Sequence, residues 1–256
     1  MSPRPSGTEL VYGLDPVREL LLASPGEVRR LLVCRRRGVE ELRELAARAG
    51  IPVEQAERGR LSRLAGTEAH QGVVALCRPF RYAELEDIVG RWRASGERAL
   101  ILALDGIQDP GNLGSLLRSA EACGAHGAII PRDRACGVTP AAVKASAGAA
   151  RHLPVARVTN LSAALRELKR AGLWVVGTDA AAPTALWQLD ASLDLVVVIG
   201  GEGTGMRPLV ARQCDLVVSI PLRGRIGSLN AAVAGAVVMF EILRQRALSA
   251  TATSRS

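Results

Sequence analysis

The stretch LVVVIGGEGTGMR, residues 195–207, joins a continuous apolar run to a loop rich in glycine. A run of this length predicts a strand that is buried on both faces. Similar runs and intervening segments of helical periodicity alternate through the rest of the chain. The predicted strands are 99–104, 127–130, 173–177, 195–200 and 216–220, and the predicted helices are 112–123, 140–149, 162–171 and 228–248. This alternation predicts an α/β fold with a parallel sheet covered by helices on both faces.

The chain before this region has shorter patterns of both kinds. Helical spacing occurs at 15–23 and 39–49, and strand patterns occur at 28–34, 51–54 and 72–76. Residues 79–98 are polar and charged, which is typical of a linker that is partly helical. We therefore expect a small α/β domain over 1–78, a linker over 79–98, a second domain over 99–248 and a disordered tail over 249–256.

The composition is that of a folded protein, because 48% of the 256 residues are apolar and 23% are charged. No apolar run is long enough to cross a bilayer, and the opening residues lack the apolar segment of a secretion signal. Five cysteines form no C-x-x-C pair, which favours free thiols in a reducing cytoplasm. The three histidines are not spaced as metal ligands, so we expect a cytoplasmic protein without a metal.

The charge favours a polyanionic partner. Lys and Arg number 33 against 25 Asp and Glu, a net charge of +8, and such a surplus attracts nucleic acid. The preference for arginine over lysine is explained equally well by codon bias in a GC-rich genome. Aromatic residues make up only 3% of the chain, which argues against recognition by stacked aromatic platforms.

The glycine-rich loop, residues 200–205, is the most informative local feature. It holds four glycines in six residues beside the carboxylate of Glu202. A Walker A loop would need a Gly-Lys-Ser/Thr sequence, and no lysine is near. A dinucleotide-binding loop would need another glycine spacing and an acidic residue about twenty positions later. Because a simple turn does not need so many glycines, the loop predicts a ligand site of another kind.

Two further loops follow predicted strands. In the first, Pro110-Gly111 forms a turn and Asn112 is a candidate N-cap for the helix that carries Arg118. Taken alone, Arg118 has the position of a solvated surface residue. In the second loop, Ser228 is the expected cap of the last helix, and Asn230 either hydrogen-bonds the loop or contacts a ligand.

Together these loops resemble the three motifs of the SpoU (TrmH) family of RNA ribose methyltransferases. The matching stretches are 104–114 with Arg118, 199–207 and 219–230, and the resemblance covers 99–248. Near the N-terminus, Val11-Tyr12-Gly13-Leu14 and the stretch from His70 to Ala75 resemble an L30e-like domain. That small domain binds substrate in the bacterial 23S rRNA guanosine 2'-O-methyltransferases, and tRNA-directed relatives that modify the D-loop typically lack it.

The resemblance implies a parallel SPOUT-type sheet with a C-terminal trefoil knot, S-adenosylmethionine as methyl donor, RNA as partner and a homodimer. The implied catalytic residues are Asn112, Arg118, Glu202, Ser228 and Asn230. The implied donor-binding residues are Thr178, Gly200, Gly201, Ile220, Leu222 and Leu229. In the mechanism proposed for the family, the residue at the position of Arg118 removes the proton from the ribose 2'-hydroxyl. Arginine is already protonated at all ordinary pH values and so is a poor base. We therefore expect Arg118 to stabilise the developing alkoxide.

The resemblance favours methylation of a guanosine in 23S rRNA and leaves three alternatives open. These are a tRNA guanosine 2'-O-methyltransferase, a resistance methylase acting on an adenosine of 23S rRNA, and a non-catalytic RNA-binding factor for ribosome assembly. The chain departs from the family pattern at Asp15, where relatives often carry histidine, and at Arg151, where an acidic residue is common. Ala231-Ala232 replaces the usual Val-Ser. None of these changes removes an implied catalytic group.

Overall fold

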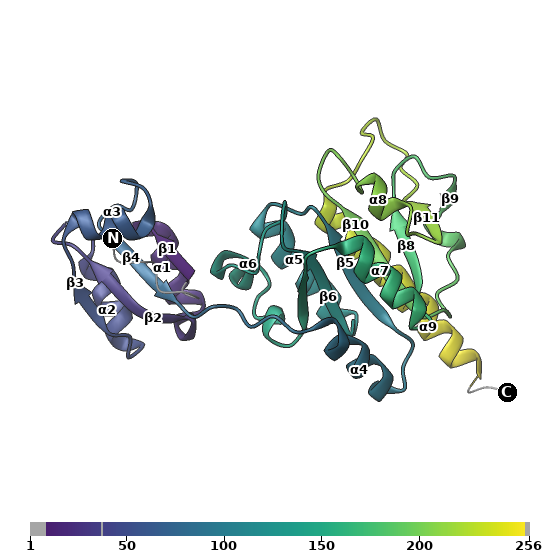
Figure 1. The fold of residues 1–256 in the computed structure, drawn as a ribbon, viewed down its shortest axis with the longest axis horizontal. Coiled ribbons are helices and arrows are strands. Elements are labelled where there is room, and N and C mark those ends of the chain that lie inside the picture. The colour runs from purple at the N-terminus through teal and green to yellow at the C-terminus, as the bar shows by residue number, and fades with distance from the viewer. Residues whose placement is uncertain (1–8, 37, 254–256) are drawn as a thin grey trace. The chain divides into compact units, whose positions relative to one another are not determined.

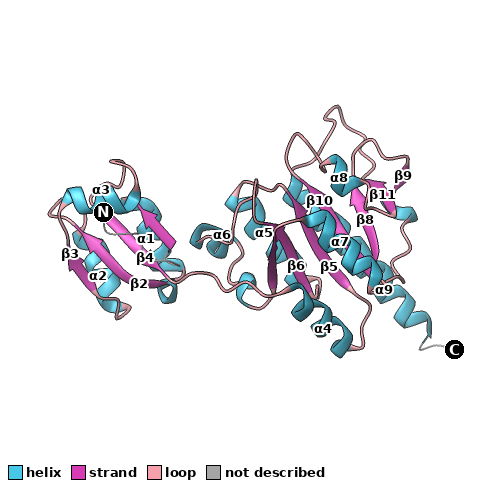
Figure 2. Cartoon of the chain, in the orientation of Figure 1, coloured by secondary structure: helices cyan, strands magenta, loops and turns pink. Residues whose placement is uncertain are grey.

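The computed structural model describes residues 9–36 and 38–253 and divides the chain into two compact units. Unit 1 holds the described residues up to Arg81 together with Thr139–Lys144. Unit 2 holds Tyr82–Val138 and the described residues from Ala145 onward. Figures 1 and 2 show the elements of each unit. The boundary between the two units thus falls close to the predicted start of the linker.

Unit 1 is a four-stranded mixed sheet with helices on both faces. The strand order is β1-β4-β2-β3, in which β4 is antiparallel to both of its neighbours and β3 is parallel to β2. Helices α1 and α2 share one core with the sheet, and α3 contributes Leu61 to a core on the opposite face. The elements are β1 Glu9–Tyr12, α1 Leu14–Ala23, β2 Val28–Val33, α2 Glu40–Arg48, β3 Val53–Gln55, α3 Arg58–Ala65 and β4 Val73–Cys77.

Unit 2 contains a seven-stranded sheet whose described pairings are all parallel, which confirms the predicted sheet type. The strand order is β7-β6-β5-β10-β8-β11-β9. The central strands are fully buried, as the continuous apolar runs predict. The strands are β5 Leu100–Asp105, β6 Gly127–Pro131, β7 Val155–Val158, β8 Trp174–Thr178, β9 Thr184–Ala185, β10 Leu195–Gly200 and β11 Leu216–Ser219.

Helices cover both faces of this sheet, as Figure 1 shows with α7 in front of the strands and α9 behind them. On one face α4, α7 and α8 contribute Ile88, Leu165 and Val210 to a core with alternate residues of β5 and β10. On the other face α5 and α9 pack against each other. The helices of unit 2 are α4 Leu85–Ser95, α5 Pro110–Ala122, α7 Leu161–Arg170, α8 Pro208–Ala211 and α9 Ala231–Thr253. The short helix α6, Pro140–Ala145, belongs to unit 1 except for its last residue.

Two predicted segments differ from the structure. Most of the predicted linker is α4, which begins at a capping box between Glu84 and Asp87 and packs Leu85 and Ile88 into the core of unit 2. The predicted tail is wrong over 249–253, because α9 continues to Thr253, and residues 254–256 lie outside the described residues.

The order of the strands positions the loops. Strand β10 lies between β5 and β8, and β11 pairs with the far edge of β8. Since all of these strands are parallel, the loops that follow them meet at one edge of the sheet, where α/β proteins usually bind ligands. Within the described residues, no helix is long and apolar enough to span a membrane.

Candidate active site

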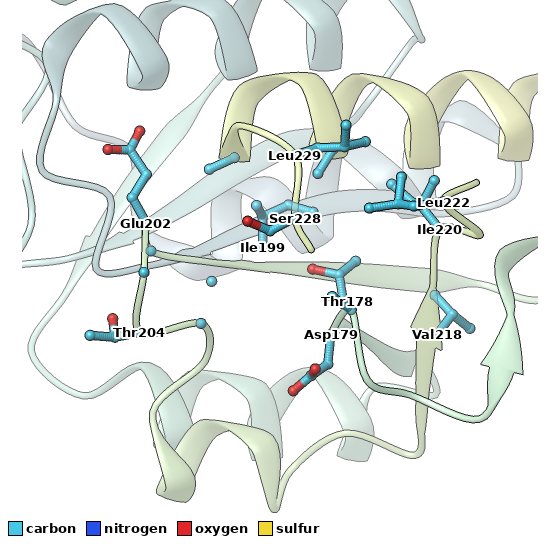
Figure 3. Close-up of a pocket in the computed structure, with 17 residues that line it drawn as sticks. Thr178, Asp179, Ile199, Glu202, Thr204, Val218, Ile220, Leu222, Ser228 and Leu229 are labelled. Carbon is cyan, nitrogen blue, oxygen red and sulfur yellow. The ribbon is translucent and has the colours of Figure 1, made fainter. Parts of the chain in front are cut away.

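A cavity of about 330 Å³ lies at the carboxyl ends of β8, β10 and β11. All six residues predicted to bind the methyl donor line it, and two predicted catalytic residues, Glu202 and Ser228, line it as well. In Figure 3 the apolar side chains of Val218, Ile220 and Leu222 gather at one end of the cavity, and Glu202 and Thr204 lie at the other. The full lining is Thr178, Asp179, Ala180, residues 199–205, Val218, Ile220, Leu222, Ser228, Leu229, Ala231 and Ala234.

Glycine is required where the loop after β10 folds back on itself. Gly201 and Gly205 exchange backbone hydrogen bonds of 3.0 and 3.2 Å. A Cβ on Gly200 would lie 2.3 Å from the carbonyl carbon of Gly205, and one on Gly201 would lie 2.7 Å from the carbonyl oxygen of Gly106. Both contacts are with backbone, which has little freedom to move away. The loop therefore presents bare backbone to the cavity, as a ligand loop should.

A chain of three side chains joins the three predicted motifs. The Asn112 amide Nδ2 donates to the carboxylate Oε1 of Glu202, and Asn230 Nδ2 donates to Asn112 Oδ1 at 3.0 Å. Asn112 and Asn230 lie outside the cavity lining, but their partner Glu202 is part of it. The structure thus brings together residues that are 118 positions apart and holds the entry of α9 against the start of α5.

Two predicted helix caps are wrong. The carboxylate of Asp109, not Asn112, caps α5, because Pro110 occupies the first helical position and Asp109 accepts from the backbone N–H of Asn112 at 2.7 Å. Asn230, not Ser228, caps α9, since its Oδ1 accepts from the backbone N–H groups of Ala232 and Val233 at 2.9 and 3.2 Å. Because Asp109 and Asn230 cap the helices, the side chains of Asn112 and Ser228 are free for other contacts. Asn112 donates to the lining residue Glu202, and Ser228 lines the cavity.

Arg118 lies on the exposed face of α5, with Gly111 and Ser115. Within the described residues it makes no hydrogen bond or ion pair, and it does not line the cavity. The structure therefore does not bring Arg118 into the cavity of the same chain. Its guanidinium is available to a ligand that extends beyond the cavity.

Three polar groups at the site were not predicted from the sequence. Asp179 and Thr204 line the cavity, and Asp105 lies beneath it, hydrogen-bonded to Arg207 at the far end of the glycine loop. The signal for Asp105 was its position at the end of an apolar run, where a carboxylate needs a buried partner. Asp179 follows β8 directly, so the rule that ligands collect at strand ends would have selected it.

A metal site needs several ligating side chains in one place, and a nucleophilic thiol needs a low pKa. The described residues contain no group of three or more His, Cys, Asp or Glu side chains placed to hold a metal ion. Cys214 packs beside the Met206 sulfur at 3.9 Å, and burial raises the pKa of its thiol to about 11. It is therefore a protonated packing residue at neutral pH.

The cavity has the chemistry that S-adenosylmethionine requires. Apolar side chains at one end suit an adenine ring, and the bare backbone of the glycine loop offers N–H and C=O groups. Two carboxylates, Asp179 and Glu202, border the cavity and favour a cationic ligand. The residues present thus fit the methyl donor.

Comparisons with known proteins agree with this chemistry. A family model described as the SpoU rRNA Methylase family matches residues 99–240, and one described as RNA 2'-O ribose methyltransferase substrate binding matches residues 10–83. A relative from Bacillus subtilis (strain 168), named "Putative TrmH family tRNA/rRNA methyltransferase YacO", is 45% identical over 81% of this chain and 83% of its own length.

Solved structures match nearly the whole chain. The crystal structure of the SpoU methyltransferase AviRb from Streptomyces viridochromogenes with AdoMet is 30% identical, has a TM-score of 0.63, and covers 96% of this chain and 94% of that one. The AdoMet-bound rRNA methyltransferase from Sinorhizobium meliloti is 29% identical, has a TM-score of 0.63, and covers 94% of this chain and 88% of that one. Both units therefore have counterparts in these proteins.

Proposed function

This chain belongs to the SpoU rRNA methylase family, and on that premise we propose that it methylates the ribose 2'-hydroxyl of a guanosine in 23S rRNA. It is an RNA methyltransferase that uses S-adenosylmethionine as the methyl donor. The observation that carries the proposal is the chain of hydrogen bonds from Asn230 through Asn112 to Glu202 at the border of the donor-shaped cavity.

S-adenosylmethionine, when bound, supplies a methyl group activated by its sulfonium. Gly200 and Gly201 would hold the donor through their backbone, and Ile220, Leu222 and Leu229 would enclose its apolar part. Thr178, whose hydroxyl donates to the carbonyl of Val198 at 3.1 Å, would border the same pocket.

The catalytic roles follow from the hydrogen bonds and from charge. Arg118 would stabilise the alkoxide that develops at the ribose oxygen, because a cation near developing negative charge lowers the barrier. Asn112 and Asn230 would orient the ribose, and their mutual hydrogen bond would hold the starts of α5 and α9 together. Ser228 would offer its hydroxyl as a hydrogen-bonding group in the cavity lining. Glu202 would position Asn112 through the hydrogen bond that it accepts.

We also propose a homodimer. One face of α9 leaves Val233, Phe240 and Leu243 exposed by 49%, 49% and 38%, although the opposite face is buried in unit 2. A helix that is apolar all round is normally covered on all sides. A second copy packed on this stripe would bury it.

Two details of the fold belong to the same proposal. The L30e-like identity of unit 1 is supported by the match of residues 10–83 to a substrate-binding model. A trefoil knot is supported by the path of the chain after β11. In the sheet, β8 lies between β10 and β11. After β11 the chain nevertheless returns past β8, because α9 contacts β10 and α5.

The preference for 23S rRNA over tRNA rests on unit 1. The rRNA methyltransferase from Sinorhizobium meliloti covers this unit as well as the catalytic one, because it covers 94% of the chain. A net charge of +8 suits a large polyanion. We propose a cytoplasmic location for the same reason, which the free cysteines among the described residues support, since thiols remain reduced there.

Methyl transfer from labelled S-adenosylmethionine to unmodified 23S rRNA and to unmodified bulk tRNA tests the proposal. The expected result is label in 23S rRNA, located on the ribose of a guanosine. Label on an adenosine of 23S rRNA would favour the resistance methylase, and label in tRNA alone would favour the tRNA enzyme. RNA binding without label in either RNA or in ribosomal precursor particles would indicate an assembly factor.

A further inference from the structure

A second cavity, of about 800 Å³, lies within unit 1 and has no part in the donor site. Residues 34–36 directly follow β2, and residues 56–58 directly follow β3. Because β2 and β3 are parallel, these two loops meet at the same edge of the small sheet. The lining residues, which we call the β2–β3 groove, are Cys34, Arg35, Arg36, Gln55, Ala56, Glu57 and Arg58.

The three arginines of this groove are free or only loosely paired within the described residues. Arg35 and Arg36 are exposed and make no ion pair with any described residue, and Arg58 meets the carboxylate of Glu68 only at 3.5 Å. By contrast, Arg30 and Arg60 both contact the carboxylate of Glu54, at 2.9 and 2.5 Å. The groove therefore places two arginines without a carboxylate partner, and a third that is only loosely paired, around one cavity.

The groove also has a built floor. Gly72, at φ +84°, lies against the loop, and a Cβ there would be 2.8 Å from the Cys34 sulfur and 3.3 Å from Arg36 Cδ. The backbone N–H of Cys34 donates to the carbonyl of Gly72 at 2.9 Å. His70 is buried, and its two ring nitrogens contact Ser62 Oγ and the Gly72 N–H at 3.0 and 3.1 Å. The motif around His70 thus braces the loop that carries Arg35 and Arg36.

We propose that the β2–β3 groove binds the sugar–phosphate backbone of the RNA substrate, with Arg35, Arg36 and Arg58 as the phosphate contacts. This inference rests on the proposed function for the identity of the polyanion. Guanidinium groups match phosphate oxygens in geometry and charge, and three of them outweigh the single carboxylate of Glu57. The carboxylate of Glu57 repels phosphate, so removing its charge should strengthen the binding of RNA.

The first test compares two triple variants that lose the same charge. Arg35→Gln/Arg36→Gln/Arg58→Gln removes the groove cations, and Arg18→Gln/Arg30→Gln/Arg60→Gln removes three cations that are paired with carboxylates. The probe is an unmodified 23S rRNA transcript, and the readout is its dissociation constant over a range of salt concentrations. The groove variant is expected to bind roughly tenfold more weakly. Its salt slope is expected to fall by about 2, at about 0.7 per lost contact with single-stranded RNA.

Equal losses in the two triple variants would overturn the proposal, because net charge alone would then explain the binding. Glu57→Gln supplies a test that misfolding cannot imitate. It is expected to tighten binding of the transcript several-fold, and unchanged or weaker binding would contradict a phosphate site.

A chemical footprint on the wild-type protein gives a third readout. Cys34 is partly exposed in the groove, while burial raises the pKa of Cys77 to about 12 and of Cys123 to about 11. Alkylation followed by peptide mass spectrometry therefore reports on Cys34 separately. The transcript is expected to slow alkylation of Cys34 in the wild type and to leave it unchanged in the groove variant. Equal alkylation with and without the transcript would contradict the proposal.

Methyl transfer by the wild type is measured on the same transcript. If the wild type transfers methyl groups and both triple variants bind the transcript equally, the groove is not an RNA site and the proposed function stands. If the transcript is bound through the groove and no methyl group is transferred, the proposed function is wrong and the groove stands as an RNA site.

Discussion

The carboxylate of Asp105, at the end of β5, accepts two hydrogen bonds from Arg207, which lies 102 residues later in the chain. One comes from the Arg207 backbone N–H and one from its Nε, each at 2.6 Å. Asp105 is only 1% exposed, so the pair forms in a weakly screened environment. It fixes the end of the glycine loop to a central strand and so sets the shape of the donor cavity.

Asp105→Asn removes the charge but keeps the size of the side chain. We expect the free energy of unfolding to fall by about 2 kcal/mol, because hydrogen bonds to a charged group are lost. We also expect the dissociation constant of S-adenosylmethionine to rise, since the loop end is released. Denaturant unfolding and calorimetry measure the two effects.

The matched control for this variant is Glu41→Gln, which removes a carboxylate from the exposed pair with Arg18. It should change stability by less than ~0.5 kcal/mol. If Asp105→Asn behaves like this control and binds the donor normally, the pair does not shape the cavity.

Asn230 has two functions that two substitutions separate. Asn230→Ala removes the α9 cap and should cost about 1 kcal/mol of stability. Asn230→Asp keeps the cap oxygens and places a carboxylate at a helix N-terminus, so stability should be maintained. Both variants lose the Nδ2 donor to Asn112, and methyl transfer should fall about tenfold or more in each. Full activity in Asn230→Asp would show that Asn230 is only a cap.

Much of the fold is predictable because the signals are strong. The five predicted strands of unit 2 and its parallel sheet are confirmed, since long apolar runs between periodic helices allow few other arrangements. The missed elements carry weak signals: β9 has two residues, α8 has four, and β7 contains the charged Arg157. The sequence predicts only a partly helical linker where α4 lies, because the charged exposed face of this helix obscures its apolar positions.

The site is predictable only in part for a related reason. The six residues that the motif resemblance implies for donor binding all line one cavity, but Asp179 and Thr204 line it as well and carry no such signal. The hydrogen bonds of Asn112 and Asn230 depend on which residue caps each helix, and the choice between neighbouring polar residues was not decidable from the sequence. The pairing of Asp105 with Arg207 joins distant loops, so only the folded chain reveals it.

Acid should weaken a group of side-chain hydrogen bonds within α9. The pKa of the Glu241 carboxyl is lowered from 4.5 to about 2, chiefly by hydrogen bonds from Arg244 at 2.8 Å, with Gln245 also donating. A lowered pKa in the folded state stabilises the protein above pH 4.5, and this contribution is lost as the pH falls toward 2.

Glu241→Gln should therefore cost roughly 1 kcal/mol near neutral pH, since Arg244 is largely exposed and the pair is partly screened. Its difference from the wild type should shrink between about pH 5 and pH 2. Unfolding curves across this range check the prediction, with Glu40→Gln as an exposed control. A difference that is constant with pH would contradict it.

The central claim is that this site methylates RNA with the help of Arg118. The most direct test is single-turnover transfer of labelled methyl groups to unmodified 23S rRNA by the wild type and by Arg118→Ala. Because Arg118 is exposed and contacts no described residue, stability should stay within ~0.5 kcal/mol, and donor binding should be unchanged. We predict ribose methylation by the wild type and a loss of about 10²–10³-fold in the variant. Transfer by Arg118→Ala at the wild-type rate would contradict the account.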